Sequence, residues 1–200
     1  MKIQTKNQTS NRNRFLPVVL TAALLLLVGC VVTSVYPYYT DKDLVFDPTL
    51  LGKWVNMADT NQPPPFLRIE QVGDKVYRAI AFEQDETNSC EVHLFRLKQR
   101  LFLDSFPTNR DLNFVPVHQV SKVIRTEPTL DTADLNYDWL KTLLEKNPKA
   151  IRHLVLPDNP DDKQGRIVLT ADTKELQRFV IKYLNDTNAW NKTDHWKRLD

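Results

Sequence analysis

The chain has 200 residues, a mass of 23.3 kDa and a formal net charge of +2, from 27 Lys and Arg against 25 Asp and Glu. Residues 1–29 hold four basic residues and no acidic one, so removing these four from the 27 leaves 23 basic residues against 25 acidic ones. The remainder is slightly acidic and lacks the basic excess of nucleic-acid-binding domains. Only four glycines are present, which argues against the clustered Gly-rich loops that cradle phosphates in nucleotide-binding proteins.

The N-terminus has the parts of a secretory signal: a polar, basic stretch, an apolar run over 15–28, and Gly29-Cys30. Leu27-Val28-Gly29-Cys30 resembles the lipobox of bacterial lipoproteins, in which a signal peptidase cleaves just before an invariant Cys. The resemblance implies that residues 1–29 are a signal peptide and that Cys30 carries acyl chains, palmitate among them, in the mature protein.

Two interpretations of this anchor remain open. Residues 15–35 contain no charge and are long enough to span a bilayer, so an uncleaved single-pass N-terminal anchor competes with lipidation of Cys30. In both cases the basic residues keep the N-terminus in the cytoplasm and send the rest across the membrane. Val31, where lipoproteins of enteric-type bacteria can carry Asp, is similar to their outer-membrane sorting class. We therefore expect a bacterial cell-envelope protein, on the outer membrane facing the periplasm rather than on the inner membrane.

Cys90 has no cysteine partner once Cys30 is acylated, so no disulfide is expected. Glu91 beside it would not stabilise a thiolate, which favours a buried and unreactive thiol. His93 follows at an odd spacing, so in a regular strand the two side chains point to opposite faces and do not form a Cys/His pair.

After a short tether over 30–43, the chain consists of short segments rich in β-branched and aromatic residues. Turn signals such as Gly73-Asp74 separate them about every ten residues, which is typical of an antiparallel meander or barrel. Alternation is imperfect at Leu94-Phe95, where a β-bulge is one explanation. The expected strands cover 50–55, 66–70, 75–82, 90–97, 101–104, 115–125 and 129–133.

Two amphipathic helices follow. Asn136 is a good N-cap residue and Pro148 a stop signal for the first helix, whose leucines share one stripe. Asp172 and Glu175 fit a capping box for the second helix, whose apolar residues recur with helical spacing up to Leu184.

Further strands are expected at 151–156 and 166–170, and the polar segment 185–200 is expected to lie over the body of the domain. The sequence thus predicts a single α+β domain over 44–200. Its β-rich part is an antiparallel meander or barrel, completed by two C-terminal helices.

Gly52-Lys53-Trp54, at the start of the first expected strand, is similar to the Gly-x-Trp signature of lipocalin-like proteins. This resemblance covers only 49–55. It implies an eight-stranded barrel in which the Trp closes one end while the other end holds an apolar ligand. The alternative is that Trp54 is simply a core residue, which an aromatic of this size usually is.

A second resemblance is closer in length and order, to an uncharacterised family of small bacterial lipoproteins. The similar segments are 46–54, 138–141, 147–153 and 169–177. This family implies no particular activity.

The sequence offers no recognisable catalytic or metal site. The histidines His93, His118, His153 and His195 are scattered without ligand spacing, and each is expected at the surface or on an edge strand. The mature chain has no Gly-x-Ser-x-Gly elbow. The remaining carboxylates of interest lie in turns and are expected to be solvated; they are Asp41, Asp43, Asp85, Glu86, Asp158, Asp161 and Asp162.

Aromatic side chains on the expected strands suggest a candidate ligand cavity lined by Trp54, Tyr77 and Phe95, although such residues more often form a packed core. We expect a membrane-anchored, non-enzymatic protein without a cofactor. Its expected partners are the membrane, through acylated Cys30, and either an apolar small ligand or an envelope protein. An envelope hydrolase with an unrecognised site and a purely structural envelope component remain alternatives. The sequence does not set the oligomeric state.

Overall fold

The computed structural model describes residues 31–59, 64–83, 86–108, 117–156 and 165–199. The expected signal peptide and Cys30 lie outside the described residues. So do Asp85 and the loop carboxylates Asp158, Asp161 and Asp162.

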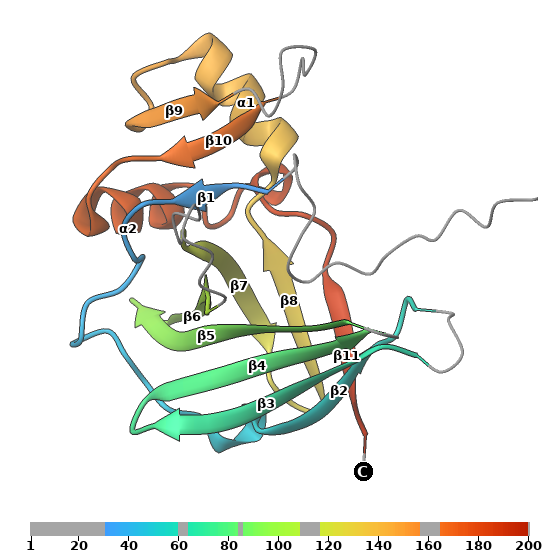
Figure 1. Cartoon of the computed structure of the whole chain (residues 1–200). Helices are drawn as coiled ribbons and strands as arrows, with labels where there is room; N and C mark the ends of the chain where they lie inside the picture. Colours follow the sequence, from blue (N-terminus) through green and yellow to red (C-terminus); the bar gives the residue numbers. More distant parts are fainter. Residues whose placement is uncertain (1–30, 60–63, 84–85, 109–116, 157–164, 200) are drawn as a thin grey trace, which may run out of the picture.

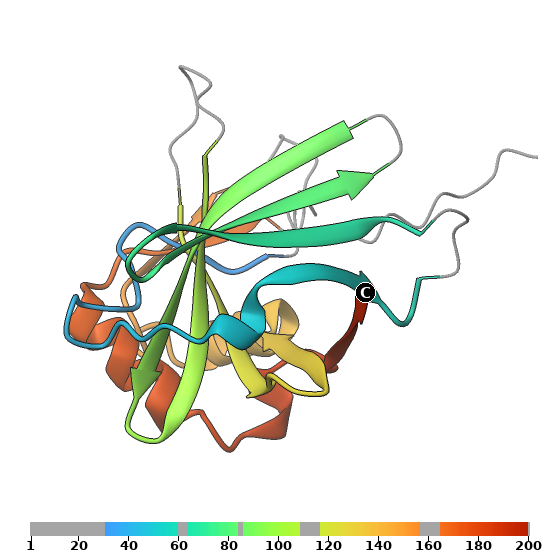
Figure 2. The same ribbon diagram turned by 90° about the horizontal axis from the view of Figure 1, so that it is seen from below.

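Eight antiparallel strands form a closed barrel, which confirms the predicted fold class (Figure 1). Seven of them follow one another around the barrel as a meander, and the C-terminal strand closes it. Figure 2, the view from below, shows this last strand between the first and the last strands of the meander. The barrel strands are β2 (Gly52–Asn56), β3 (Phe66–Gly73), β4 (Val76–Glu83), β5 (Glu86–Leu97), β6 (Arg100–Pro107), β7 (Gln119–Arg125), β8 (Thr129–Asp134) and β11 (Asp194–Leu199).

The barrel interior is an apolar core. Side chains of alternate residues point inward, as the period of two in a β-strand requires. Cys90 on β5 belongs to this interior, while His93 points outward, so the opposite-face prediction is confirmed. The interior cluster is Leu50, Trp54, Leu67, Ile69, Tyr77, Ala79, Ala81, Cys90, Val92, Leu94, Val123, Leu130 and Trp196.

A second, three-stranded sheet has the order β1 (Thr33–Ser34), β10 (Arg166–Leu169), β9 (His153–Leu156). Helices α1 (Tyr137–Lys146) and α2 (Thr173–Lys182) pack with one face of this sheet and with the outer wall of the barrel. Short 3₁₀ turns at Pro48–Leu50 and Thr187–Ala189 precede β2 and β11.

Both helices begin where the sequence predicts. The Asn136 side chain accepts a hydrogen bond from the backbone N–H of Trp139, and the Asp172 side chain accepts one from Glu175. Each cap satisfies a backbone donor that the first helical turn leaves unpaired. Leu140 and Leu144 of α1 and Leu176, Phe179 and Val180 of α2 are buried, which confirms the predicted apolar stripes.

No bulge interrupts β5 at Leu94-Phe95, because the register with β6 is continuous there. Leu94 faces the barrel interior, whereas Phe95 faces the second core beneath the helices. Two covered faces, rather than an extra residue, explain why apolar residues are adjacent at this point.

The segment expected to be a tether is largely part of the folded body. Residues 33 and 34 pair with β10, Tyr38 is fully buried, and the Tyr39 ring stacks on His93 with 4.5 Å between ring centroids. Among the described residues, no helix is both long and apolar enough to cross a bilayer.

Candidate functional site

Trp54 and Tyr77, two of the three candidate cavity residues, lie together in the barrel interior. The Trp54 indole donates a hydrogen bond to the Leu50 carbonyl at 2.9 Å. The Tyr77 hydroxyl exchanges hydrogen bonds with the backbone of Asp47, and burial raises its pKa. These contacts hold the turn before β2 against the barrel. Trp54 and Tyr77 are therefore packed against the segment from Asp47 to Leu50.

Phe95 does not join them. It lies on the outer side of the barrel wall, where its ring stacks on Phe102 at 5.5 Å and contacts Tyr39 at 6.0 Å. The sequence could not separate the two sides of β5, because both are apolar at this point.

Arg198 contacts both the glycine and the tryptophan of the Gly-x-Trp segment. The Arg198 guanidinium lies over the Trp54 ring, 4.4 Å from its centroid, and donates hydrogen bonds to the carbonyls of Thr49 and Leu51. Gly52 has a φ of 126°, and a Cβ placed on it would lie 2.6 Å from Arg198 Nη1. A residue without a side chain is thus needed where the guanidinium crosses the chain.

The cavity inside the barrel has a volume of about 50 Å³ and is lined by neither Trp54 nor Tyr77. Known ligand pockets hold roughly 300–1,000 Å³, so this space accommodates a few water molecules rather than a lipid. Its walls are apolar apart from a polar end that includes Ser121 and Asp134. Solvent reaches Asp134, but protein surrounds it on the other sides. Burial therefore raises the pKa of this carboxyl, while a hydrogen bond from Ser121 partly offsets the effect.

His93 is buried and His118 is half-buried, although the sequence predicts both at the surface or on an edge strand. Only 6% of His93 and 12% of the His118 side chain are exposed. Segment 33–39 covers this part of the barrel, because the backbone of Ser34 pairs with His118 and the Tyr39 ring lies on His93. Burial lowers the pKa of His93.

The fully buried carboxylate of Asp104 joins this covering segment to the barrel. Its Oδ2 accepts a hydrogen bond from the backbone N–H of Tyr38 at 2.9 Å, and its Oδ1 lies 2.6 Å from Nδ1 of His118. Such a histidine–carboxylate pair can also orient a general base. Here the second oxygen of the carboxylate holds the covering segment, which gives the pair a structural role.

The other two histidines lie elsewhere. His195 is exposed beside Asp131, and His153 on edge strand β9 contacts the Ile151 carbonyl. Among the described residues, no group of three or more His, Cys, Asp or Glu is placed to hold a metal ion. Cys90 is buried in the barrel, which raises its thiol pKa to about 12.

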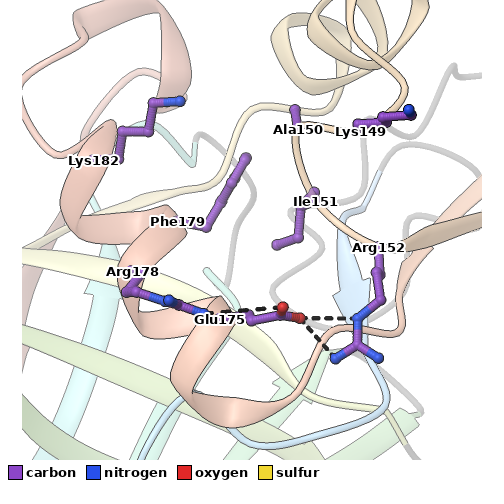
Figure 3. Close-up of a pocket in the computed structure, with 8 residues that line it drawn as sticks. All are labelled: Lys149, Ala150, Ile151, Arg152, Glu175, Arg178, Phe179 and Lys182. Atoms are coloured by element: carbon purple, nitrogen blue, oxygen red, sulfur yellow. Dashed lines mark hydrogen bonds and ion pairs between the residues drawn. The ribbon is translucent and has the colours of Figure 1, made fainter.

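A second candidate site is a basic cleft of about 240 Å³ between α2 and the turn that precedes β9 (Figure 3). Helix α2 contributes residues at positions i, i+3, i+4 and i+7, which share one helical face. Ile151 and Phe179 are buried and form an apolar floor. The lining residues are Lys149, Ala150, Ile151, Arg152, Glu175, Arg178, Phe179 and Lys182.

Four cations and one carboxylate therefore surround this floor. Arg152 donates to Glu175 Oε2 through Nε at 2.9 Å and Nη2 at 2.7 Å, which raises the pKa of the guanidinium. Arg178 lies 3.9 Å from the same carboxylate. Figure 3 shows Glu175 between the two arginines at one end of the cleft, and Lys149 and Lys182 towards the other end.

Asp172 also lies 3.4 Å from Arg152, so two carboxylates face four cations and the cleft keeps an excess of positive charge beside an apolar floor. This arrangement suits a ligand with phosphate or carboxylate oxygens and a short hydrocarbon part. Among the described residues lining the cleft, none is a Ser, Cys or His that could act as a nucleophile or general base near neutral pH.

No family model, curated protein or solved structure matches this chain. The barrel is compatible with a lipocalin-like barrel in its eight antiparallel strands.

Sequence reasoning missed both the cleft and the buried Asp104. The signal for half of the cleft was present, since Glu175, Arg178 and Lys182 recur on one face of the predicted helix. Nothing in the sequence placed the turn at 149–152 opposite that face. Asp104 follows three apolar residues on β6, but its burial depends on the segment that folds over it.

Proposed function

We propose that this chain is a lipid-anchored protein of the bacterial cell envelope, whose domain binds an anionic group of another envelope component in the cleft beside α2. The observation that carries the binding role is the excess of cations in this cleft, with Lys149 and Lys182 at the end away from Glu175. The lipid anchor is proposed from the lipobox-like segment that ends at Cys30.

The cleft supports this function better than the barrel supports the binding of an apolar ligand. The space inside the barrel is about 50 Å³, whereas the cleft offers about 240 Å³ and combines charge with an apolar floor. An arginine pair held by one carboxylate is also partly pre-organised, since both guanidinium groups already have a fixed neighbour. A phosphate or carboxylate near Lys149 and Lys182 would complete the charge balance.

Anion binding is tested by the shift in melting temperature of residues 31–200 on titration with inorganic phosphate and, separately, with a short Glu-rich peptide. The parent is expected to be stabilised by one of these ligands, since binding to the folded state alone raises stability. The double variant Lys149→Gln, Lys182→Gln should lose the effect. Lys174→Gln should keep it, because Lys174 is exposed on the same helix but does not line the cleft.

Equal stabilisation of both variants, or none of the parent by either ligand, would refute the cleft as a binding site. A response to phosphate alone would favour phosphorylated envelope material. A response to the peptide alone would favour an acidic segment of an envelope protein.

The anchor is tested by mass spectrometry of the mature chain and of the Cys30→Ala variant. The parent should begin at Cys30 and carry the mass of the acyl chains, whereas the variant should stay unacylated. Identical processing and membrane retention of the two chains would rule out lipidation at Cys30.

A further inference from the structure

Among the described residues, the helices cover one face of the three-stranded sheet and leave the other uncovered. Ile167 and Leu169 of β10 are buried against α1 and α2. On the opposite face the register places Thr33, Val168 and Leu154 side by side across the three strands.

This face carries several exposed apolar side chains beside Thr33 and Arg166. Leu154 is 54% exposed and Leu156 40% exposed on β9, and Val35, directly after β1, is 43% exposed. Strand alternation puts all three on the same side as Val168. Single exposed aliphatic residues are common, but several on one small face indicate a surface that contacts something apolar.

The position of the anchor indicates what this face contacts. Thr33 pairs with Val168 in parallel, and Arg166 pairs with Leu156, so the same register brings Val31 level with Leu156. Neighbouring strands lie about 4.8 Å apart, and a chain advances by at most about 3.6 Å per residue. Val31, the residue next to the proposed anchor, is two strands away from Leu156 and therefore within about 10 Å of it.

We infer that the uncovered face of the β1–β10–β9 sheet rests on the bilayer that holds the acyl chains, with Leu154, Leu156 and Val35 at the boundary between headgroups and acyl chains. The inference rests on the proposed acylation of Cys30. An acyl anchor at this distance confines the sheet to the membrane surface, so its apolar side chains can leave water there at little further entropic cost.

The open edge of β9 limits how deeply this face can enter the membrane. Among the described strands, β9 has a neighbour on one side only, and its outer backbone groups still need hydrogen-bond partners. That requirement limits insertion to the interface, where water and headgroups supply such partners.

The test places an environment-sensitive fluorophore on the full acylated chain in vesicles of phosphatidylethanolamine and phosphatidylglycerol. One chain carries the label at Leu154→Cys, and the matched control carries it at Ile124→Cys. Ile124 is also apolar and 51% exposed, but it lies six residues along β7 from His118, which bridges β1. That separation is about 20 Å along the strand. Cys90 is buried and should not react.

Quenching by a spin-labelled lipid is expected to be stronger at position 154 than at position 124, and to decrease when Leu156→Asp is added to the chain labelled at 154. Equal quenching at the two positions would overturn the inference. A different outcome would also overturn it: the label at 154 is shielded from water increasingly as protein density rises, but the lipid does not quench it. That result would indicate strand pairing between copies instead. The number of labels per chain, read by mass spectrometry, separates the two proposals. One label means that Cys30 is blocked by acylation, whereas two labels refute the anchor itself.

Discussion

Gly52→Ala should destabilise the domain well beyond an ordinary glycine substitution. At a φ of 126° an alanine is strained by about 1–3 kcal/mol. Its Cβ would also displace the Arg198 guanidinium from 2.6 Å away, which weakens the contact with the Trp54 ring and the bonds to two carbonyls. The weakened contacts add about 1 kcal/mol to the backbone strain, so we expect Gly52→Ala to lower the free energy of unfolding by about 2–4 kcal/mol in total.

Equilibrium urea unfolding of residues 31–200, followed by far-UV circular dichroism, measures this change. Gly73→Ala is the control, because the φ of Gly73 is not positive and its added Cβ would meet only the Val76 side chain at 3.1 Å. In an Arg198→Met background the cost of Gly52→Ala should fall to the backbone strain alone. An equal cost for both glycines, or an unchanged cost in the Arg198→Met background, would refute the proposed role of the guanidinium.

Three further predictions concern single titratable groups. Because the pKa of Asp134 is raised, its carboxyl stays protonated to a higher pH in the folded chain than in the unfolded chain. The free energy of unfolding therefore falls as the pH rises through the folded pKa. Asp134→Asn should therefore be more stable than the parent at neutral pH but not near pH 3, in urea unfolding at both pH values; an advantage independent of pH would contradict this. The pKa of His93 is lowered, so the unfolded chain takes up the proton first and stability falls as pH drops from about 7 towards 5. His93→Gln should make the pH profile of the melting temperature flatter over that range, and an equally steep profile would argue against the buried neutral imidazole. The Cys90 thiol, with a pKa of about 12, should react with a thiol reagent at pH 8 only after urea is added, and rapid reaction of the native chain would show that it is accessible.

The sequence predicted the seven meander strands of the barrel and both helices because each has a strong local signal. Alternating apolar residues on β3 and β4 need only a covered inner face, and the caps Asn136 and Asp172 act within one helical turn. Neither depends on contacts with distant parts of the chain.

β11 was not predicted as a strand, because Trp196 is its one large buried side chain. The rest of the strand is stabilised by its neighbours. It fills the gap between β2 and β8, and the inward-facing Arg198 has an aromatic ring and two carbonyls as partners. A polar strand of this kind is recognisable only when the strands on both sides are already in place.

The same argument explains why the candidate sites were out of reach. The cleft joins α2 to a turn more than twenty residues earlier, and the three-stranded sheet joins β1 to β10, separated by more than 130 residues. Periodicity reports which face of an element is apolar, but not which element covers it. On β9, three consecutive apolar residues are typical of a buried strand, whereas among the described residues they are exposed at the edge of a sheet. Contiguous exposed apolar side chains favour a surface that contacts an apolar partner, and for the lipid anchor proposed above the bilayer is the nearest apolar phase.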